Sequence, residues 1–516
     1  MYAKIPVWYI SILLPVLVGL LGLILGERKG SLIAKLSAIS LIIPTLALGH
    51  YWANVNIAEG IVDPIAIDLT KYKLGTFALV LDGLSAPIIL GISLVTAFVA
   101  IYGYKYMTVR IEEMHSEGEK APSIGAYYFL YNVFAVSMLG MALANNLIFF
   151  YFFLEVSLIS SFLLIAYYGY GDRRKISLLY FIWTHVAGAL FIAGVLYYGV
   201  KAGSFDILTI SNTGVISYIA PASTTIGSAY KIAAAAIIVG LFIKMAVFGV
   251  HMWLPYAHAE APTPVSALLS PNLIGIAGYA FIRFAFPLFP EVIYKIHYYL
   301  LGLAIITIIY GGLVALRQTD FKRFLAYSSV SQMGYLLLGI ATLSAYGIGG
   351  AILHYFTHAI GKAVLFMVAG VFITELHGLR NITKMGGLAR AYPLMAAAAL
   401  LGFMHLVGMP PTIGMWSELL ITIGVVKAIP LTTVDNVIVV ATVLILSFGI
   451  SAAYAFITMR KIFYGQLKEQ VPQEVMDGFK YAVIVLAVLG VVFFLIVAPL
   501  MSPLQQASEL VASLIG

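Results

Sequence analysis

The chain contains 516 residues, of which 62% are hydrophobic and only 10% are charged, and its formal net charge is +7. Soluble domains carry about 25% charged residues, so this composition excludes an ordinary soluble protein and indicates a membrane protein. Cysteine is absent, which excludes disulfides, thiolate metal sites and cysteine-ligated iron–sulfur clusters.

Apolar runs long enough to cross a hydrocarbon core of about 30 Å recur from one end of the chain to the other. The first run has no small-residue cleavage site, so we expect a retained span rather than a removed signal peptide. The pattern predicts an all-α polytopic membrane protein with about 14 transmembrane helices. The predicted spans lie near residues 7–26, 32–52, 78–104, 124–144, 146–169, 177–200, 232–253, 264–286, 296–316, 324–343, 347–374, 392–426, 434–459 and 481–500.

Lysine and arginine test this count, because the cytoplasmic loops of membrane proteins carry an excess of both residues. The odd-numbered connections between predicted spans hold 19 basic residues, and the even-numbered connections hold 7. We therefore expect the odd-numbered connections to face the cytoplasm and both termini to lie outside. The same bias accounts for the positive net charge, so no nucleic-acid partner is expected.

Two predicted spans are interrupted at similar places. The seventh breaks around Gly249–Pro255, and the twelfth breaks around Gly408, Pro410 and Pro411. Such breaks are typical of transporters built from inverted repeats, although glycine and proline also occur in spans without a transport role. The breaks lie five spans apart, and an odd shift reverses the direction through the membrane. We therefore predict two inverted five-helix repeats, spans 4–8 and 9–13, in a chain divided into a three-helix segment (1–122), a first repeat (123–286), a second repeat (287–465) and a C-terminal helix with its tail (466–516).

Glu155 in the fifth span and Lys244 in the seventh are ionisable residues within apolar runs. A charge centred in a membrane costs about 2.5–3.5 kcal/mol on insertion scales, so both residues are functional candidates. Desolvation disfavours each charged form, whereas an opposite charge nearby restores it. A carboxylate that approaches and leaves Lys244 would switch the lysine between holding and releasing a proton. The alternative is a static pair that only fixes helix packing.

The eleventh span carries His354, His358 and Lys362 at spacing i, i+4 and i+8, which places them on one helix face. We call these three residues the His–Lys row. Imidazole titrates near neutral pH, so the row could relay protons through side chains and water. A zinc site is the competing interpretation, because HxxxH can present two ligands. No glutamate follows the first histidine and lysine is a poor ligand, so we expect no metal.

Glu418 is the remaining acid near the middle of an apolar run, in the twelfth span. Its place relative to the break matches that of Lys244 in the first repeat. A buried carboxylate needs a partner or must lose its charge, and Lys362 is the only basic residue that the sequence offers for this role. Glu418 could therefore end a proton relay through the second repeat.

Four further residues are candidates on weaker grounds. His251 and His258 flank the break of the seventh span, where they could take up protons or cap free backbone groups. For His251 we favour the functional interpretation, and for His258 we hold the two equal. His185 in the sixth span and Asp82 near the outer end of the third span complete the set.

Six stretches run in the order of one known family: DGLSA at 82–86, FYFFLE at 150–155, IKMAVFGVHMWLPYAHAEAPTPVSALL at 243–269, DFKRFLAYSSVSQMGY at 320–335, HYFTHAIGKAVLFMVAG at 354–370 and GMPPTIGMWSE at 408–418. With them the chain resembles the antiporter-like subunits shared by Mrp-type sodium/proton antiporters, respiratory complex I and the energy-converting membrane-bound hydrogenases. The resemblance covers most of the chain, and the combination of motifs is highly specific.

The resemblance implies a fourteen-helix fold with inverted repeats and a proton path along a central polar axis. It implies that Glu155 and Lys244 modulate this path, that the His–Lys row links the two halves, and that Glu418 forms the exit-side station. Family members commonly carry a lysine in the eighth span, and the matching position here is Gly275. The central relay is therefore expected to depend more on His251 and water.

We expect a proton-translocating subunit of a multisubunit complex in the cytoplasmic membrane of a prokaryote. The resemblance implies other antiporter-like and small helical membrane subunits as partners, with hydrogenase-like redox subunits driving transport; sodium is a candidate second ion. The chain itself should bind no redox cofactor and carry out no catalytic chemistry. A Mrp-type sodium/proton antiporter subunit is the alternative. A stand-alone solute transporter and a structural anchor are the rivals from other classes.

Overall fold

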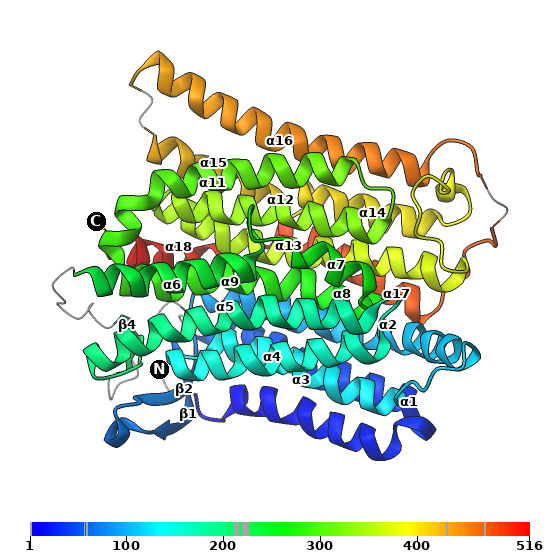
Figure 1. Ribbon diagram of the computed structural model, residues 1–516, viewed down its shortest axis with the longest axis horizontal. Coiled ribbons are helices and arrows are strands. Elements are labelled where there is room, and N and C mark those ends of the chain that lie inside the picture. Colours follow the sequence, from blue (N-terminus) through cyan, green and yellow to red (C-terminus); the bar gives the residue numbers. More distant parts are fainter. Residues whose placement is uncertain are drawn as a thin grey trace.

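The computed structural model describes residues 3–55, 57, 60–210, 216–218, 227–429, 432–468 and 471–515. Most helices lie alongside one another in a single bundle, and both termini lie at the same end of it (Figure 1). The helices are α1 (Val7–Asn54), α2 (Ser85–Ser116), α3 (Ile124–Leu143), α4 (Leu147–Tyr168), α5 (Arg173–Ala202), α6 (Ser228–Met245), α7 (Trp253–Glu260), α8 (Thr263–Leu268), α9 (Ile274–Ala280), α10 (Phe286–Leu288), α11 (Pro290–Leu316), α12 (Phe321–Ala341), α13 (Ala345–Glu375), α14 (Pro393–Leu406), α15 (Gly414–Ala428), α16 (Val434–Phe463), α17 (Gly478–Leu495) and α18 (Ala498–Ser513).

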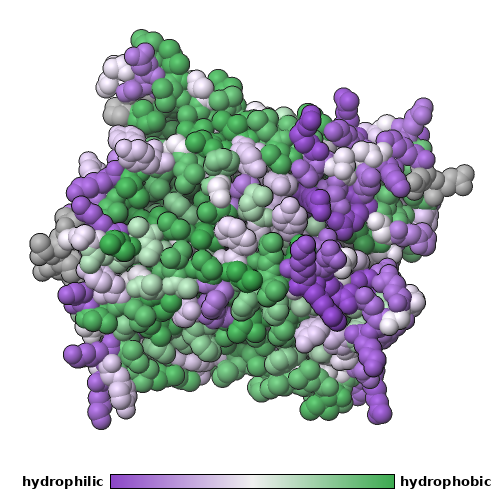
Figure 2. Space-filling model, viewed as in Figure 1, coloured by the Kyte–Doolittle hydropathy of each residue, from purple (hydrophilic) through white to green (hydrophobic). Residues whose placement is uncertain are grey.

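Twelve helical runs among the described residues are long and apolar enough to cross a membrane. Hydrophilic residues gather at the end of the bundle where α16 finishes, at the right of Figure 2, while apolar residues dominate the middle. The predicted helical membrane protein is confirmed, and the count of fourteen spans stays a prediction.

The first two predicted spans both lie within α1. A straight helix of 48 residues would be about 72 Å long. The rings of Trp8 and Tyr51, near opposite ends of α1, nevertheless have centroids only 5.9 Å apart. The backbone is non-helical at Lys29, so α1 folds back there as two antiparallel halves.

The prediction of an all-α chain missed two short antiparallel hairpins. Strand β1 (Ile61–Asp68) pairs with β2 (Thr76–Leu81), and β3 (Leu208–Ile210) pairs with β4 (Ile216–Tyr218). The third span, predicted from residue 78, therefore begins too early. The run TFALVL is apolar, and a short apolar run does not distinguish a strand from a buried helix. The side chain of Asp82 accepts the backbone N–H of Leu84 and Ser85, and α2 starts there.

The breaks expected in the seventh and twelfth spans are present. Helix α6 ends at Met245, Ala246 has a φ of +55°, and α7 begins at Trp253. The second break separates α14 from α15, with Gly408 at a φ of +61°. Both interruptions leave helix ends inside the bundle, where backbone groups lose their helical partners.

Two helical runs form the centre of the molecule. The run Thr263–Leu288 comprises α8, α9 and α10 with π-helical turns between them, and α13 packs against it. In both runs the most apolar window is completely buried. Side chains on these elements are therefore shielded from lipid.

A cluster of charges joins three helices at one end of the bundle. Lys105 of α2 contacts Glu375 of α13 at 2.8 Å and Asp477, just before α17, at 2.6 Å. Lys480 of α17 contacts the same Glu375 carboxylate at 2.6 Å. We call these four residues the α2–α13–α17 charge cluster.

Candidate functional site

Lys244 is the penultimate residue of α6, directly before the first break. Its side chain is buried, with 4% of the residue exposed, and its Nζ has no hydrogen-bond partner among the described residues. Glu155 is the charged group whose field acts on this ammonium. A buried amine without a partner is costly, so Lys244 is the most conspicuous unsatisfied group in the first half of the chain.

Glu155 and Lys244 form no ion pair with each other in this structure. Glu155 lies 3.1 Å from Nδ1 of His185, whose side chain is 50% exposed. The reason is local: Gly188 on α5 has no Cβ, and an ideal Cβ there would lie 2.4 Å from Oε1 of Glu155. The carboxylate occupies this gap against α5. His185, predicted only as a weak candidate, is thus the direct partner of Glu155.

A small cavity adjoins Lys244. It has a volume of about 10 Å³ and its lining includes Phe150, Leu154, Phe191 and Leu241. This volume is at the lower limit for one water molecule. Apart from Lys244 the lining residues are apolar, so a proton leaving Lys244 needs more water than this arrangement holds.

The two histidines at the first break lie in different surroundings. His251 is buried among aromatic rings, with ring centroids 5.0 Å from Tyr310 and 6.4 Å from Tyr327. His258 is fully buried against Phe366, at 5.1 Å. Neither imidazole has a hydrogen-bond partner among the described residues. A water molecule beside either ring would find an unpaired ring nitrogen to bond to, and neither histidine caps the break through its ring.

The His–Lys row lies on α13 in the completely buried centre. The ring centroids of His354 and His358 are 6.5 Å apart. Lys362 donates a hydrogen bond of 2.9 Å to the carbonyl of Leu325 and another to the hydroxyl of Ser328. The spacing in the sequence therefore produces a continuous buried row, and α12 supplies the acceptors that hold its lysine.

Glu418 lies on α15, just after the second break. The residue is 6% exposed, and its Oε1 has no hydrogen-bond partner among the described residues. An ideal Cβ at Gly408 would lie 2.2 Å from the carboxylate, so the glycine makes room for it. Its neighbour Ser417 contacts Nδ1 of His354 at 3.4 Å. The predicted pairing with Lys362 is wrong, because that lysine is held by α12.

The structure also corrects the proposed match between the two breaks. Lys244 precedes the first break, whereas Glu418 follows the second. The penultimate residue of α14 is His405, which therefore corresponds in position to Lys244. His405 is fully buried, and its Nδ1 lies 2.9 Å from the hydroxyl of Thr357 on α13. Sequence reasoning missed this histidine, although a lone histidine just before GMPP was a visible signal.

Four buried cations among the described residues were assigned to loops by the charge count: Arg110, Arg283, Lys322 and Lys480. Lys322, at the start of α12, is fully buried and donates to the carbonyls of Ala259 and Ala261 at the end of α7. The fields of both Lys322 and Lys362 act on His258. Lysines near span ends resemble loop lysines in a sequence, so only the fold separates the two groups.

Arg283 is another of these buried cations. It is buried in the run Thr263–Leu288, donates a hydrogen bond to Asp82 and contacts the Tyr218 hydroxyl at 3.2 Å. Because Asp82 also accepts two backbone N–H groups at the start of α2, all its contacts fit a structural role. None of these contacts involves the His–Lys row.

Gly275 faces Tyr355 on α13. An ideal Cβ at Gly275 would lie 2.5 Å from the tyrosine ring. Tyr355 therefore fills the space that a longer side chain at position 275 would need.

Among the described residues no group of three or more His, Cys, Asp or Glu side chains could hold a metal ion.

Comparisons with known proteins identify the family and the fold of the chain. The family described as NADH:quinone oxidoreductase/Mrp antiporter, TM, matches residues 144–445. NADH-quinone oxidoreductase subunit M of Rickettsia prowazekii is 32% identical over 358 residues, which cover 69% of this chain and 70% of the relative. F(420)H(2) dehydrogenase subunit M of Methanosarcina mazei is 31% identical over 446 residues, covering 84% and 83%.

Solved structures share the whole fold. A chain of respiratory complex I from Thermus thermophilus superposes with a TM-score of 0.83 at 26% identity, covering 99% of this chain and 100% of the other. A chain of the Mrp complex from Dietzia sp. gives a TM-score of 0.80 at 21% identity, covering 99% and 97%. A chain of the membrane-bound sulfane sulfur reductase, an archaeal respiratory complex, gives 0.78 at 23%, covering 98% of each.

Proposed function

The chain belongs to the NADH:quinone oxidoreductase/Mrp antiporter transmembrane family, and from this premise we propose that it translocates protons as an antiporter-like subunit of a multisubunit membrane complex. One observation carries the proposal at the level of residues. Lys244, His258, His358 and Glu418 are buried inside the bundle, and each has a titratable atom without a hydrogen-bond partner among the described residues. Residues this costly within a membrane are a sign of function.

The unsatisfied groups suggest how the subunit works. Lys244 would exchange a proton when the charge of Glu155 moves relative to it, and the His–Lys row would carry protons from the first half into the second. His405 and Glu418, on either side of the second break, would complete the route. Breaking a buried pair costs about 3–5 kcal/mol, and a charge that crosses 100 mV gains about 2.3 kcal/mol. The two energies are of the same order, so rearranging one buried pair is comparable with the work of moving one proton across the membrane.

The host is proposed to be a redox-driven complex. Two relatives named above are subunits of an NADH-quinone oxidoreductase and an F(420)H(2) dehydrogenase, which favours an oxidoreductase host over a Mrp-type antiporter. Within it this chain would carry no redox centre, and partner subunits would supply the energy. We place it in the cytoplasmic membrane with both termini outside, as the distribution of basic residues predicts.

The test measures proton pumping by the assembled complex in sealed vesicles. Lys244→Ala should reduce pumping at least tenfold, which corresponds to an increase of about 1.4 kcal/mol or more in the transport barrier, because no other amine takes its place at the end of α6. Lys231→Ala is the matched control, since Lys231 is an exposed lysine on the same helix. Normal pumping by a fully assembled Lys244→Ala complex would refute the proposed role of this residue.

A further inference from the structure

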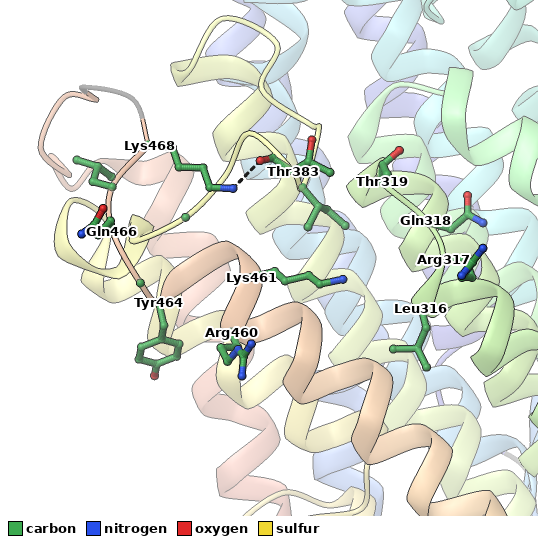
Figure 3. Close-up of a pocket in the computed structure, with 14 residues that line it drawn as sticks. Leu316, Arg317, Gln318, Thr319, Thr383, Arg460, Lys461, Tyr464, Gln466 and Lys468 are labelled. Atoms are coloured by element: carbon green, nitrogen blue, oxygen red, sulfur yellow. Dashed lines mark hydrogen bonds between the residues drawn. The ribbon is translucent and has the colours of Figure 1, made fainter.

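A hollow that the proton axis does not use lies at the end of the bundle where α11 and α16 finish. Its volume is about 1050 Å³. The end of α16 and the residues after it form one wall, and the end of α11 with the segment after α13 forms the other. Figure 3 shows Lys461 extending from α16 into the space between these walls, with Arg317 on the opposite side. We call it the basic hollow.

The lining of the basic hollow carries an excess of positive charge. Its described lining residues include four cations and no carboxylate; the cations are Arg317, Arg460, Lys461 and Lys468. Lys468 donates a hydrogen bond of 2.6 Å to the carbonyl of Thr383 across the hollow. The other three form no ion pair within the described part of the chain. Three side chains thus present unpaired charge to one concave surface.

Within the described part of the chain, nearby groups do not neutralise this charge. Asp320, just after the α11 wall, is paired with Arg380. Each helix C-terminus contributes about half a negative charge, so the ends of α11 and α16 together offset about one of the four cations. A second basic hollow, near the start of α5, differs: its lining includes Glu119 and Asp172, and Arg173 contacts Glu119 at 2.6 Å.

Exposed apolar side chains continue from the cations toward the middle of the bundle. On α11 and α16, an exposed apolar residue lies four positions before each of the three unpaired cations, which places both on one helix face. The exposed fractions are 51% for Leu313, 37% for Phe456 and 42% for Ile457. The two helices pack directly together, since an ideal Cβ at Gly312 would lie 2.2 Å from Ile450. The cations lie at the ends of two adjoining helices, and the exposed apolar residues lie one turn nearer the middle of the bundle. This arrangement is complementary to an amphiphile with an anionic head and apolar chains.

We propose that the basic hollow binds one acidic phospholipid, with its phosphate on Arg317, Arg460 and Lys461 and its acyl chains along α11 and α16. Arginine donates paired hydrogen bonds to phosphate, and lysine adds a mobile positive charge. A free phosphate would use the cations but would leave the apolar side chains below them without an occupant. The inference is independent of proton transport.

The test uses the purified full chain in detergent and counts bound lipid by native mass spectrometry during titration with phosphatidylglycerol or phosphatidylcholine. The wild type should retain one phosphatidylglycerol and bind phosphatidylcholine more weakly. The double variant Arg460→Gln/Lys461→Gln should bind phosphatidylglycerol about 30-fold more weakly, the factor expected when two cations that face a membrane phosphate are lost.

The matched control is Arg174→Gln/Lys175→Gln, which removes the same charge from the hollow lined by two carboxylates. It should bind phosphatidylglycerol like the wild type, and equal unfolding temperatures would exclude misfolding of either variant. An equal loss in both double variants would overturn the site. Displacement of the lipid by an equal concentration of inorganic phosphate would assign the hollow to free phosphate and overturn the lipid assignment.

Discussion

The ring of Tyr355 lies where a side chain at position 275 would begin, so Gly275 should tolerate no larger residue without a loss of stability. Gly275→Ala should lower the free energy of unfolding by about 1–3 kcal/mol through overpacking. Gly275→Ala/Tyr355→Leu should recover part of this loss, since the smaller side chain vacates the space. Thermal unfolding of the purified chain in detergent measures both effects.

Gly302 provides the control for this prediction. It lies within α11, and an ideal Cβ there meets nothing within 4 Å. Gly302→Ala should stabilise the chain by up to about 1 kcal/mol, because alanine favours the helix more than glycine does. If Gly275→Ala were equally stabilising, Tyr355 would not restrict position 275.

The sequence predicted which ionisable residues are candidates better than it predicted the contacts of those residues. Spacing alone placed the His–Lys row on one face, because helical periodicity is a local property. The partner of Glu155 depends instead on the gap at Gly188, which only the packing of α4 against α5 creates. Lys322 was hidden for the same reason: its burial is a consequence of where α7 ends.

The α2–α13–α17 charge cluster joins three helices, and its ion pairs should make the stability of the fold depend on pH. Burial raises the pKa of the Asp477 carboxyl, but hydrogen bonds from Lys105 and the Lys480 backbone outweigh it and hold the pKa below its usual value of 3.8. A carboxyl whose pKa is lowered by folding stabilises the fold at pH values above its pKa in the unfolded chain. This stabilisation disappears as the pH falls through its pKa in the folded chain.

Asp477→Asn should therefore lower the free energy of unfolding at pH 7 by about 0.5–1 kcal/mol, near the lower figure because solvent screens the partly exposed pair. The free energies of unfolding of wild type and variant should become equal as the pH falls below about 4, through the lowered pKa of Asp477. Thermal unfolding across this pH range measures the difference. Glu509→Gln, at an exposed glutamate without an ion pair among the described residues, should change neither the free energy of unfolding at pH 7 nor its dependence on pH. A gap that persisted at low pH would contradict the electrostatic origin.

Element boundaries divide into those that local chemistry dictates and those that packing decides. Glycine and proline near residues 249–255 and 408–411 correctly predicted both breaks, because these residues interrupt helices. Their exact positions depend on tertiary contacts: the indole N–H of Trp253 donates to the carbonyl of Ile243 at 2.9 Å across the first break. The strand β2 was mistaken for helix because its apolar run carries no period.

Orientation is a property of the whole molecule, and the absence of cysteine makes it easy to measure. Arg174 and Lys201 lie near opposite ends of α5. If basic residues face the cytoplasm, a membrane-impermeant maleimide applied to intact cells should label Lys201→Cys and leave Arg174→Cys unlabelled until the cells are opened. The reverse pattern would show that the termini face the cytoplasm.

The general architecture was accessible from sequence because membrane insertion imposes a strong rule on every span. The resemblance over six motifs supplied the fold, and the solved complexes share it. The second half of the proposed route was less accessible. His405 is a single residue in a short apolar helix, and its match to Lys244 became visible only with the helix ends.

The tight packing around Lys244 also has a consequence for biogenesis. The cavity beside this lysine holds at most about one water molecule, and aromatic rings enclose His251. In this closed arrangement the proposed proton route has little room for the water that would carry a proton past Lys244. We therefore expect a cell that inserts this chain before its partners to keep its membrane potential, provided that the chain alone retains this closed arrangement. Assembly intermediates would not act as uncouplers.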